Sequence, residues 1–432
     1  MTDYDVIVVG AGPAGSTAAR VAAEGGLRVA IFEGAAFPRE KLCGGFVSAR
    51  ALAAIGIPVP EDVIERPIHA VEIRSGGIGR RSRSASPLGI TVRRAAFDAF
   101  LLDRAREAGA EVHLSAPVRR IVPACHGSGG RAIGPAGCEP PAIEPAGSDA
   151  PLTAQIVIDA RGAAGLVGRR GPLWPFRRYS LGFAYGAILP AAAPPPAANP
   201  GPADTLILDE SPVRAGFGWA FPFDGTWNVG VGAWTPARRG LRRAYRRVAS
   251  GAAEEGLVAA EATRIRPRAA FLPPGGPPYR LTHGGVLYTG DAAGMIDPFG
   301  GEGIWGAAES GRRAAEAVVS VLARPRPGGT AARVDRGPSP AGRVQTAAPA
   351  ADRSATAFGS RVRVRVAARY RLALRPAVWE LRFALLRAGL AWLASWRRPT
   401  AGSLDRTARI VVAVMKSPVA YRRWLLGKRG TG

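Results

Sequence analysis

The first 33 residues alternate between apolar runs and a helical pattern. Residues 5–9 form an apolar strand, residues 14–23 have the pattern of a helix, and residues 28–32 form a second apolar strand. Two apolar strands joined by one helix within this short span predict a βαβ unit.

The middle of the chain has a different pattern. Apolar or alternating segments at 179–189, 203–209, 216–223 and 227–234 are broken by Pro, Gly and Asp. Short segments of this kind predict antiparallel strands. Such a sheet buries one face and leaves the other to close a cavity.

A glycine fingerprint lies in the predicted βαβ unit, between the strand and the helix. Gly10 makes the tight turn, Gly12 lets backbone approach a pyrophosphate, and Gly15 lets the helix pack closely on the strand. The helix N-terminus favours the anion. Glu33, after the second strand, is an acceptor suited to a ribose hydroxyl and argues against a 2′-phosphate. The pattern predicts a site for FAD or NAD.

A second glycine-rich segment, GDAAGMIDPFGGEGI at 290–304, follows an apolar strand. Asp291 can accept a hydrogen bond from a polyol hydroxyl. The loop, with a helix that starts near Gly303, can stabilise negative charge on a flavin pyrimidine. Because NAD needs neither feature, this segment favours FAD.

With these motifs the chain resembles the FAD-dependent geranylgeranyl reductase family, within the larger group of aromatic hydroxylases and flavin halogenases. The resemblance covers most of the chain and includes, in order, the glycine fingerprint, Glu33, FPREKLCGG (37–45), RRAAFDAFLLDRA (93–105), VIDARG (157–162) and the segment at 290–304. It implies an α/β fold: a Rossmann-type FAD-binding domain with an inserted antiparallel-sheet substrate domain and a C-terminal helical segment.

The resemblance also implies which residues contact the cofactor. They are Gly10, Gly12, Ala14, Gly15, Glu33, Cys43, Gly44, Arg94, Val118, Asp159, Asp291, Gly303 and Ile304. Arg94 is expected to hydrogen-bond the ribityl or phosphate region. Cys43 is placed against the flavin ring, where it could position the substrate, donate a proton as a catalytic residue, or only pack. Its chemistry depends on a perturbed pKa that sequence does not show.

The segment GWAFP at 218–222 resembles the aromatic-Pro motif that lines the lipid cavity of these reductases. The expected substrate-binding residues are Phe217, Trp219, Phe221 and Pro222. The alternative is that Trp219 and Phe221 are ordinary sheet core. Phe217 stands where the family often has Tyr, so the proton donor stays open.

The histidines do not fill that gap. None of His69, His113, His126 and His283 lies in a motif that can be placed beside the flavin. No metal site is evident in the sequence, and we expect none.

The expected domain boundaries follow the motifs. Residues 1–165 and 280–322 form the FAD-binding domain, with a small interrupting segment at about 61–90 and a disordered loop at about 123–150. The substrate domain takes residues 166–279. A low-complexity linker at 323–360 precedes basic C-terminal helices at 361–432.

The charge is strongly positive, with a formal net charge of +25. Nucleic-acid binding is not expected, because there is no recognisable module and no aromatic-basic strand pattern. An anionic membrane surface fits better, since residues 361–398 mix arginines with Leu, Trp and Phe. The alternative role of these helices is a cap on the FAD-binding domain, and both roles are compatible.

The location is expected to be cytoplasmic, with peripheral membrane association. The first strand begins almost directly after Met1, which leaves no room for a signal peptide, and the apolar run at 383–396 is too short to span a bilayer. Cys43, Cys125 and Cys138 fit a reducing compartment without a disulfide framework.

We therefore expect an FAD-dependent oxidoreductase that reduces carbon–carbon double bonds of an isoprenoid, such as a geranylgeranyl lipid or a quinone tail, by hydride transfer from flavin N5 and protonation. There is no second nicotinamide fingerprint, so NADPH, NADH or a ferredoxin would reduce the flavin transiently. The alternative is an oxygen-using hydroxylase or halogenase-like enzyme. A non-catalytic membrane-surface flavoprotein is a minor alternative, and the oligomeric state stays open.

Overall fold

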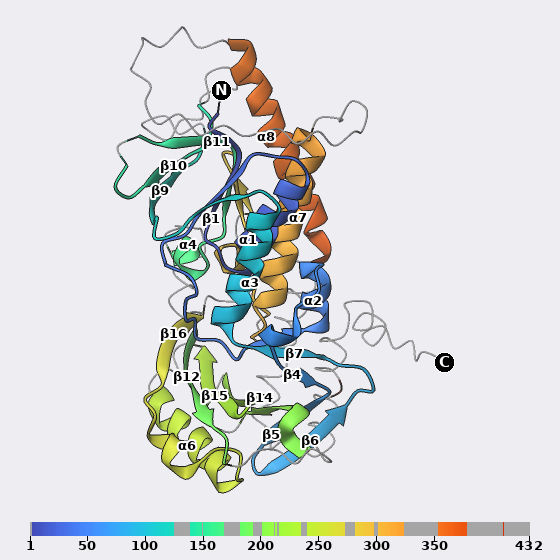
Figure 1. The fold of residues 1–432 in the computed structure, drawn as a ribbon, viewed down its shortest axis with the longest axis vertical. Helices are drawn as coiled ribbons and strands as arrows, with labels where there is room; N and C mark the ends of the chain where they lie inside the picture. Colours follow the sequence, from blue (N-terminus) through green and yellow to red (C-terminus); the bar gives the residue numbers. More distant parts are fainter. Residues whose placement is uncertain are drawn as a thin grey trace.

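The computed structural model describes residues 2–124, 139–148, 150–167, 182–192, 201–210, 212–213, 216–234, 240–272, 281–297, 301–323, 353–377 and 409. Two sheets stand at opposite ends of an elongated molecule, with helices packed against each (Figure 1). The predicted Cys125, Cys138 and His126 lie outside the described residues.

The first sheet has a parallel core in the order β18-β11-β1-β2-β8, with β17 antiparallel to β18 and a β9–β10 hairpin paired to β11. Its strands are β1 (Tyr4–Val9), β2 (Val29–Phe32), β8 (Glu111–His113), β9 (Val118–Val122), β10 (Ala142–Pro145), β11 (Leu152–Asp159), β17 (Thr282–His283) and β18 (Val286–Tyr288). The predicted strands at 5–9 and 28–32 are β1 and β2, and they pair in parallel. The βαβ prediction is confirmed.

Three long helices pack beside this sheet: α1 (Pro13–Glu24), α3 (Arg94–Glu107) and α7 (Ile304–Leu322). Small residues let α1 and α7 approach closely, because a Cβ on Gly311 would overlap the backbone of Ala14. The helices and strands share one apolar core, in which Ile7, Ile31 and Ile158 are fully buried. The short elements α4 (Ala163–Val167) and η5 (Gly290–Ala293) contact each other.

The second sheet has the order β16-β12-β15-β14-β13-β5-β6. Its strands are β5 (Ala70–Ser75), β6 (Ile78–Arg83), β12 (Gly182–Pro190), β13 (Thr205–Asp209), β14 (Gly216–Phe223), β15 (Thr226–Trp234) and β16 (Arg268–Leu272). All neighbours pair antiparallel except β5 and β13. Helix α6 (Leu241–Glu254) covers one face, together with η4 (Ala260–Arg264), whereas η3 (Gly201–Asp204) contacts β4, β13 and β14.

A small sheet with the order β3-β7-β4 lies between the two large ones (Figure 1). It consists of β3 (Phe46–Ser48), β4 (Ile64–Ile68) and β7 (Gly89–Val92), with α2 (Ala49–Ile55) and η1 (Glu61–Val63) nearby. Thr91 Oγ1 donates a 2.8 Å hydrogen bond to the carbonyl oxygen of Pro222, which ties this sheet to β14.

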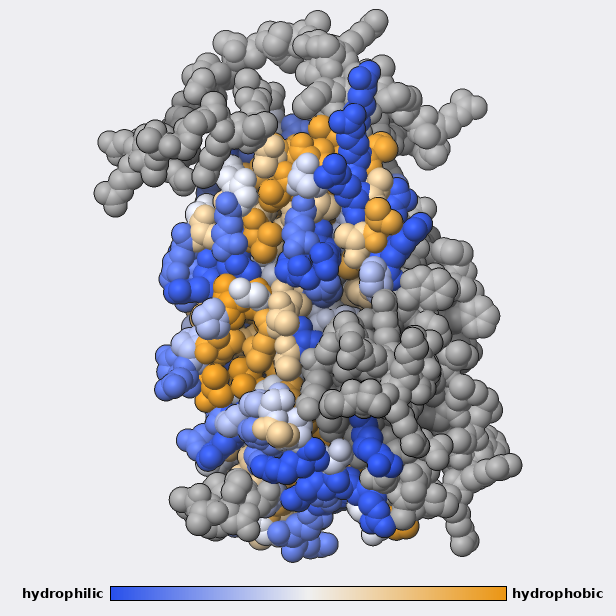
Figure 2. Space-filling model, turned by 90° about the vertical axis from the view of Figure 1, so that its right-hand side faces the viewer, coloured by the Kyte–Doolittle hydropathy of each residue, from blue (hydrophilic) through white to orange (hydrophobic). Residues whose placement is uncertain are grey.

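The described part of the C-terminal region is helix α8 (Arg353–Ala373), which packs on α7. The buried Tyr370 hydroxyl donates a 2.5 Å hydrogen bond to the carbonyl oxygen of Tyr288 on β18. Hydrophilic and apolar side chains are intermixed on the face that carries α8 (Figure 2). This helix therefore caps the FAD-binding unit, one of the two roles that the sequence left open.

Several boundaries differ from the sequence-based expectations. The segment at 61–90 supplies β5 and β6 to the second sheet, so it belongs largely to that unit. Strand β10 lies within the range expected as a loop at 123–150, and α8 begins at Arg353, inside the expected linker. The cause in each case is pairing or packing with a segment distant in the chain. No helix among the described residues is long and apolar enough to cross a membrane.

Candidate functional site

The two glycine-rich turns meet at the carboxyl ends of neighbouring strands. Strands β1 and β18 both pair with β11, so the turns that follow them lie at one edge of the first sheet. A Cβ on Gly290 would lie 3.2 Å from Cβ of Ala14. Ligands of open parallel sheets bind at such an edge.

The three glycines of the first turn differ in what surrounds them. Gly10 has a φ of +101°, and its Cβ position lies 2.5 Å from the carbonyl oxygen of Ala160. A Cβ on Gly15 would overlap the carbonyl oxygen of Gly10. Gly12 has only the tip of Arg39 within reach, 3.5 Å from its Cβ position. Packing therefore requires Gly10 and Gly15, whereas Gly12 leaves space at the N-terminus of α1.

Glu33, at the carboxyl end of β2, holds the turn in place. Its Oε2 accepts a 2.8 Å hydrogen bond from the backbone N–H of Ala11, and its Oε1 accepts a 3.0 Å bond from that of Ala35. Each carboxylate oxygen keeps a lone pair for a further donor. The strand that carries Val118 adjoins this position, since Ala116 N–H donates to the Glu33 carbonyl oxygen at 2.8 Å.

The Asp159 carboxylate binds the side chain of Arg161, two residues further along the chain. The side chain is 1% exposed and accepts hydrogen bonds from Arg161 Nε at 3.0 Å and Nη2 at 2.8 Å. The structure thus places Asp159 at the end of β11, beside the site, with its carboxylate oriented by Arg161.

A buried charge cluster lies beneath the segment FPREKLCGG. Arg94 forms two 2.8 Å hydrogen bonds with Asp98, and Arg39 Nη1 lies 3.2 Å from the same carboxylate. Arg94 also lies near the Cys43 side chain, which contributes to the raised pKa of the guanidinium. Burial disfavours the charged guanidinium, but the negative charge of Asp98 outweighs burial, and the pKa of Arg94 is raised.

Asp291 is a half-buried carboxylate that makes no side-chain hydrogen bond or ion pair with the described residues. Burial raises its pKa, while the positive charges of Lys41 and Arg94 act in the opposite direction. A Cβ on Gly303, at the N-terminus of α7, would lie 3.6 Å from Asp291 Oδ1. Ile304, which begins α7, is 6% exposed.

The unpartnered Asp291 carboxylate and the open space at Gly12 fit the hydroxyl-bearing chain and the pyrophosphate of FAD. Gly12 would hold the pyrophosphate at the N-terminus of α1, and Asp291 would accept from a hydroxyl. Glu33 would accept from the ribose. The residues present are therefore compatible with this cofactor.

The loop before α7 is anchored by a cluster that the sequence analysis missed. Glu302 accepts hydrogen bonds from Ser48 Oγ and from Arg50, whose Nε lies 2.9 Å from Oε2. The Arg50 guanidinium lies 4.1 Å from the centre of the Trp305 ring and 3.5 Å from Asp297. The acidic residues in the segment DPFGGE were the available signal for this cluster.

Strand β14 presents its predicted aromatic residues toward the cofactor motifs. Side chains alternate along a strand, so Phe217, Trp219 and Phe221 share one face. A Cβ on Gly301 would lie 3.4 Å from Phe217, and a Cβ on Gly44 would lie 2.7 Å from Phe221. Pro222 lies on the other face of the strand, which packs on α6 through Gly218 and Val248.

A buried amide joins this strand to the Cys43 segment. Trp219 Nε1 donates a 3.0 Å hydrogen bond to Asn228 Oδ1, and Asn228 Nδ2 donates a 2.7 Å bond to the carbonyl oxygen of Cys43. Asn228 is 5% exposed. Sequence reasoning missed Asn228, although one amide within an otherwise apolar strand was a signal.

Comparison with known proteins adds independent evidence. Residues 5–172 match the family model of the FAD dependent oxidoreductases. The chain is similar to menaquinone reductase of Mycolicibacterium smegmatis, with 33% identity over 338 residues that cover 74% of this chain and 77% of that protein. It is also 33% identical to digeranylgeranylglycerophospholipid reductase 1 of Methanopyrus kandleri over 331 residues, which cover 74% and 81% of the two chains.

Solved structures show the same fold. A geranylgeranyl bacteriochlorophyll reductase-like protein of Thermoplasma acidophilum aligns with a TM-score of 0.69 and 20% identity, covering 98% of this chain and 96% of that one. A flavin-dependent brominase aligns with a TM-score of 0.55 and 21% identity, covering 74% and 79%. These likenesses support the expected arrangement of a Rossmann-type sheet and a separate, mainly antiparallel sheet.

Proposed function

The chain belongs to the FAD-dependent geranylgeranyl reductase family, an oxidoreductase family acting on carbon–carbon double bonds, and we propose that its substrate is an isoprenoid lipid or a quinone tail. The observation that carries this proposal is the hydrogen-bonded link from Trp219 through Asn228 to Cys43. It joins an aromatic strand to the segment beside the candidate cofactor site.

The aromatic face suits an apolar chain. Phe217 and Phe221 are partly exposed, and Trp219, 7% exposed, packs edge-on against Phe217, so the face is apolar and rings of this kind exclude water from a substrate. Asn228 holds the Trp219 indole in one orientation by accepting its only donor. A flexible prenyl chain could therefore lie along a surface whose shape is set before it binds.

Reduction of an isolated double bond requires a hydride on one carbon and a proton on the other. FAD, when bound in its reduced form, supplies the hydride. We assign the proton to Cys43 Sγ, because Asn228 fixes the backbone of this residue beside the aromatic strand and its side chain lies near the buried Arg94. Solvent then returns a proton to the sulfur, so the thiol is not consumed.

Two further residues, Asp98 and Asn228, position Arg94 and Cys43. Asp98 fixes the Arg94 guanidinium with two hydrogen bonds. Asn228 fixes the backbone of Cys43. The flavin must be reduced by a donor that binds transiently, for which we propose NADPH or NADH, with a ferredoxin as the alternative. We also propose that the enzyme works at the cytoplasmic surface of a membrane, where its substrate resides.

The proposal is tested in the absence of oxygen. The purified flavoprotein is reduced and mixed with geranylgeranyl diphosphate or a menaquinone, while flavin absorbance and product mass are followed. Flavin reoxidation with a gain of two hydrogen atoms per saturated bond is expected. A flavin that stays reduced until oxygen is admitted, and then oxygenates or halogenates a substrate, would replace the reductase by an oxygen-using enzyme.

A matched pair of variants separates a catalyst from a flavoprotein that only binds. Trp219→Ala removes the indole from the aromatic face and should abolish turnover while FAD stays bound. Phe183→Ala changes an aromatic residue of β12 whose ring packs against Phe271 at a tilt, and should leave turnover within about threefold. Equal turnover in both variants would contradict the assignment of Trp219.

A further inference from the structure

The second sheet carries an uncompensated basic surface. On α6, Arg242, Arg243, Arg246 and Arg247 are exposed, while Leu241 and Tyr245 are buried against the sheet. The four arginines lie on the solvent side at i,i+4 spacing, so two pairs of like charges adjoin along the helix. None of the four forms an ion pair with a described residue.

Arginines on two other helices, α3 and α7, have acidic partners. On α3, Arg104 pairs with Glu107 and Arg106 with Asp103. On α7, Arg312 and Arg313 both pair with Glu309 and Glu316. The arginines of α6 therefore differ from those of α3 and α7, whose acidic partners lie on the same helix.

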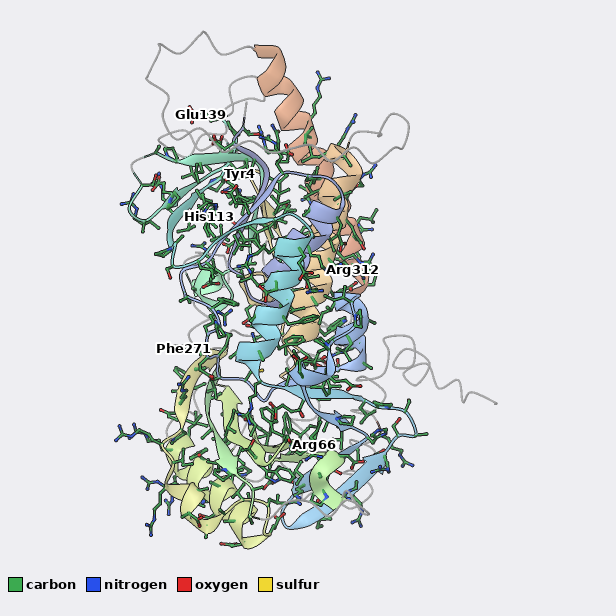
Figure 3. All side chains as sticks on the ribbon, in the orientation of Figure 1. Tyr4, Arg66, His113, Glu139, Phe271 and Arg312 are labelled. Atoms are coloured by element: carbon green, nitrogen blue, oxygen red, sulfur yellow. The ribbon has the colours of Figure 1, made fainter. Side chains whose placement is uncertain are left out.

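Apolar side chains are exposed next to these arginines. Phe271 on the edge strand β16 is 59% exposed, and Ile265, directly after η4, is 41% exposed. Figure 3 shows Phe271 at the outer edge of the second sheet, near the junction with the FAD-binding unit, and nitrogen-tipped side chains projecting from α6. Arg264, Arg266 and Arg268 lie in the same segment as the two apolar residues.

These parts form one continuous surface. Helix α6 packs with η4 in a common apolar cluster, and β16 pairs with β12, which α6 also contacts. We define the basic docking surface as Arg242, Arg243, Arg246, Arg247, Ile265 and Phe271. Lipid bilayers with anionic headgroups offer a partner for both components, since phosphates attract arginine and the interface accepts apolar side chains.

The surface lies close to the segment that carries Cys43. Arg268 Nη1 on β16 is 3.9 Å from Glu40, in the segment that leads to Cys43. Leu42 reaches β12, because a Cβ on Gly186 would lie 3.2 Å from its Cδ1. Helix α8, which also carries exposed arginines and the exposed apolar Val364 and Leu372, lies at the opposite end of the long axis (Figure 1), so substitutions on α6 and α8 test separate surfaces.

We propose that the basic docking surface of α6, η4 and β16 binds an anionic membrane, with the β16 edge turned toward the lipid. This inference rests on the proposed isoprenoid substrate. In this orientation the prenyl chain passes from the bilayer toward the segment that carries Cys43. The surface, rather than the C-terminal helices, is then the main membrane contact.

The test uses the full-length flavoprotein and flotation with vesicles. One set contains equal parts phosphatidylglycerol and phosphatidylcholine, and the other contains phosphatidylcholine alone. Wild-type protein should float only with the anionic vesicles and should be released by high salt. The double variant Arg242→Glu/Arg246→Glu should weaken binding at least about tenfold. Phe271→Ser should weaken it less while keeping the same salt dependence.

The matched control is Arg361→Glu/Arg365→Glu on α8, which makes the same charge change at two exposed positions. It should bind the vesicles like the wild type. Equal loss in both double variants, loss only in the α8 variant, or no anionic binding by the wild type would overturn the proposal. Tighter binding to a duplex DNA oligonucleotide than to vesicles, lost in the α6 variant, would assign the surface to nucleic acid instead.

The readout is independent of turnover. Both double variants should reduce geranylgeranyl diphosphate in solution like the wild type, because neither pair of arginines contacts the site. Absence of turnover in every protein, with vesicle binding that depends on α6, would reject the proposed function and keep the docking surface. Circular dichroism and FAD content verify that each variant is folded.

Discussion

Arg94 and Asp98 form a bidentate ion pair across one turn of α3, with both side chains buried and both N–O distances at 2.8 Å. Arg39 adds a second positive charge to the same carboxylate, and the side chain of Cys43 lies near Arg94. One acid therefore organises two segments that the sequence separates by about fifty residues.

Replacing Asp98 by Asn should destabilise the protein strongly. The change leaves two largely buried guanidinium groups without an anion, and breaking a buried pair in this way costs about 3 to 5 kcal/mol. The free energy of unfolding, measured in urea, should fall by that amount. Asp103→Asn, on the solvent side of the same helix, should change it by less than about 0.5 kcal/mol. Similar values for the two variants would contradict the organising role of Asp98.

Asn228 should matter more for turnover than for cofactor retention. Asn228→Ala leaves the Trp219 indole and the Cys43 carbonyl oxygen without partners, which costs about 1 to 3 kcal/mol of stability. Because Asn228 does not touch the glycine-rich turns, the ratio of FAD to protein should stay unchanged while kcat falls.

Asn228→Asp is the matched control. An aspartate still accepts from Trp219 but cannot donate to the Cys43 carbonyl oxygen while ionised. Its kcat should lie between those of the wild type and Asn228→Ala. Wild-type turnover in Asn228→Ala would remove the amide from the proposed mechanism.

Alanine substitutions at Gly12 and Gly15 should affect different properties, FAD binding at Gly12 and folding at Gly15. In Gly15→Ala the new methyl group overlaps the carbonyl oxygen of Gly10, so the fold should be lost or strongly destabilised. In Gly12→Ala the methyl group has space and an ordinary backbone φ of −74°, so Tm of the protein without FAD should change little. Its affinity for FAD should fall, because the methyl occupies the space for the pyrophosphate. Tight FAD binding by Gly12→Ala would contradict this placement.

The Asp291 carboxylate should lower the stability of the FAD-free protein and strengthen its binding of FAD. Its effect on stability should depend on pH. Burial raises the pKa of its carboxyl group in the folded protein, so the folded state holds the proton more tightly than the unfolded chain. The contribution of Asp291 to the stability of the folded protein is therefore most favourable below the ordinary carboxyl pKa of about 4. It is lost as the pH rises through the raised pKa of the folded protein.

The FAD-free variant Asp291→Asn should accordingly be more stable than the wild type at neutral pH, and the difference should shrink on acidification. Urea denaturation at a series of pH values measures this. The same variant should bind FAD more weakly, because an amide replaces the accepting carboxylate. Asp62→Asn, at an exposed position, serves as the control. A stability difference that grows on acidification would contradict the raised pKa.

Much of the fold could be predicted from local patterns in the sequence. The apolar strands around the glycine fingerprint and the helix between them were predictable, because period and turn chemistry act within about thirty residues. The same holds for β12 to β15, whose alternation and breaking residues predicted antiparallel strands. The parallel pairing of β5 with β13 was not predictable, since it joins segments more than a hundred residues apart.

The candidate site, like the fold, could be predicted from the sequence only in part. The residue types at Gly10, Gly12, Gly15, Glu33 and Asp291 indicated an FAD-type site from spacing alone. The partners of Asn228, Glu302 and Arg94 did not follow from spacing, because each side chain meets a segment brought to it by the fold.

By itself, the sequence determined the cofactor class and the two sheet types, because glycine geometry, strand alternation and helix period are local properties of the chain. Only the tertiary structure decided that Phe221 of β14 meets the Cys43 segment, that α8 caps the first unit, and that the arginines of α6 have no acidic partner among the described residues. These depend on which distant segments pack together, and a pattern along one chain does not encode that pairing directly.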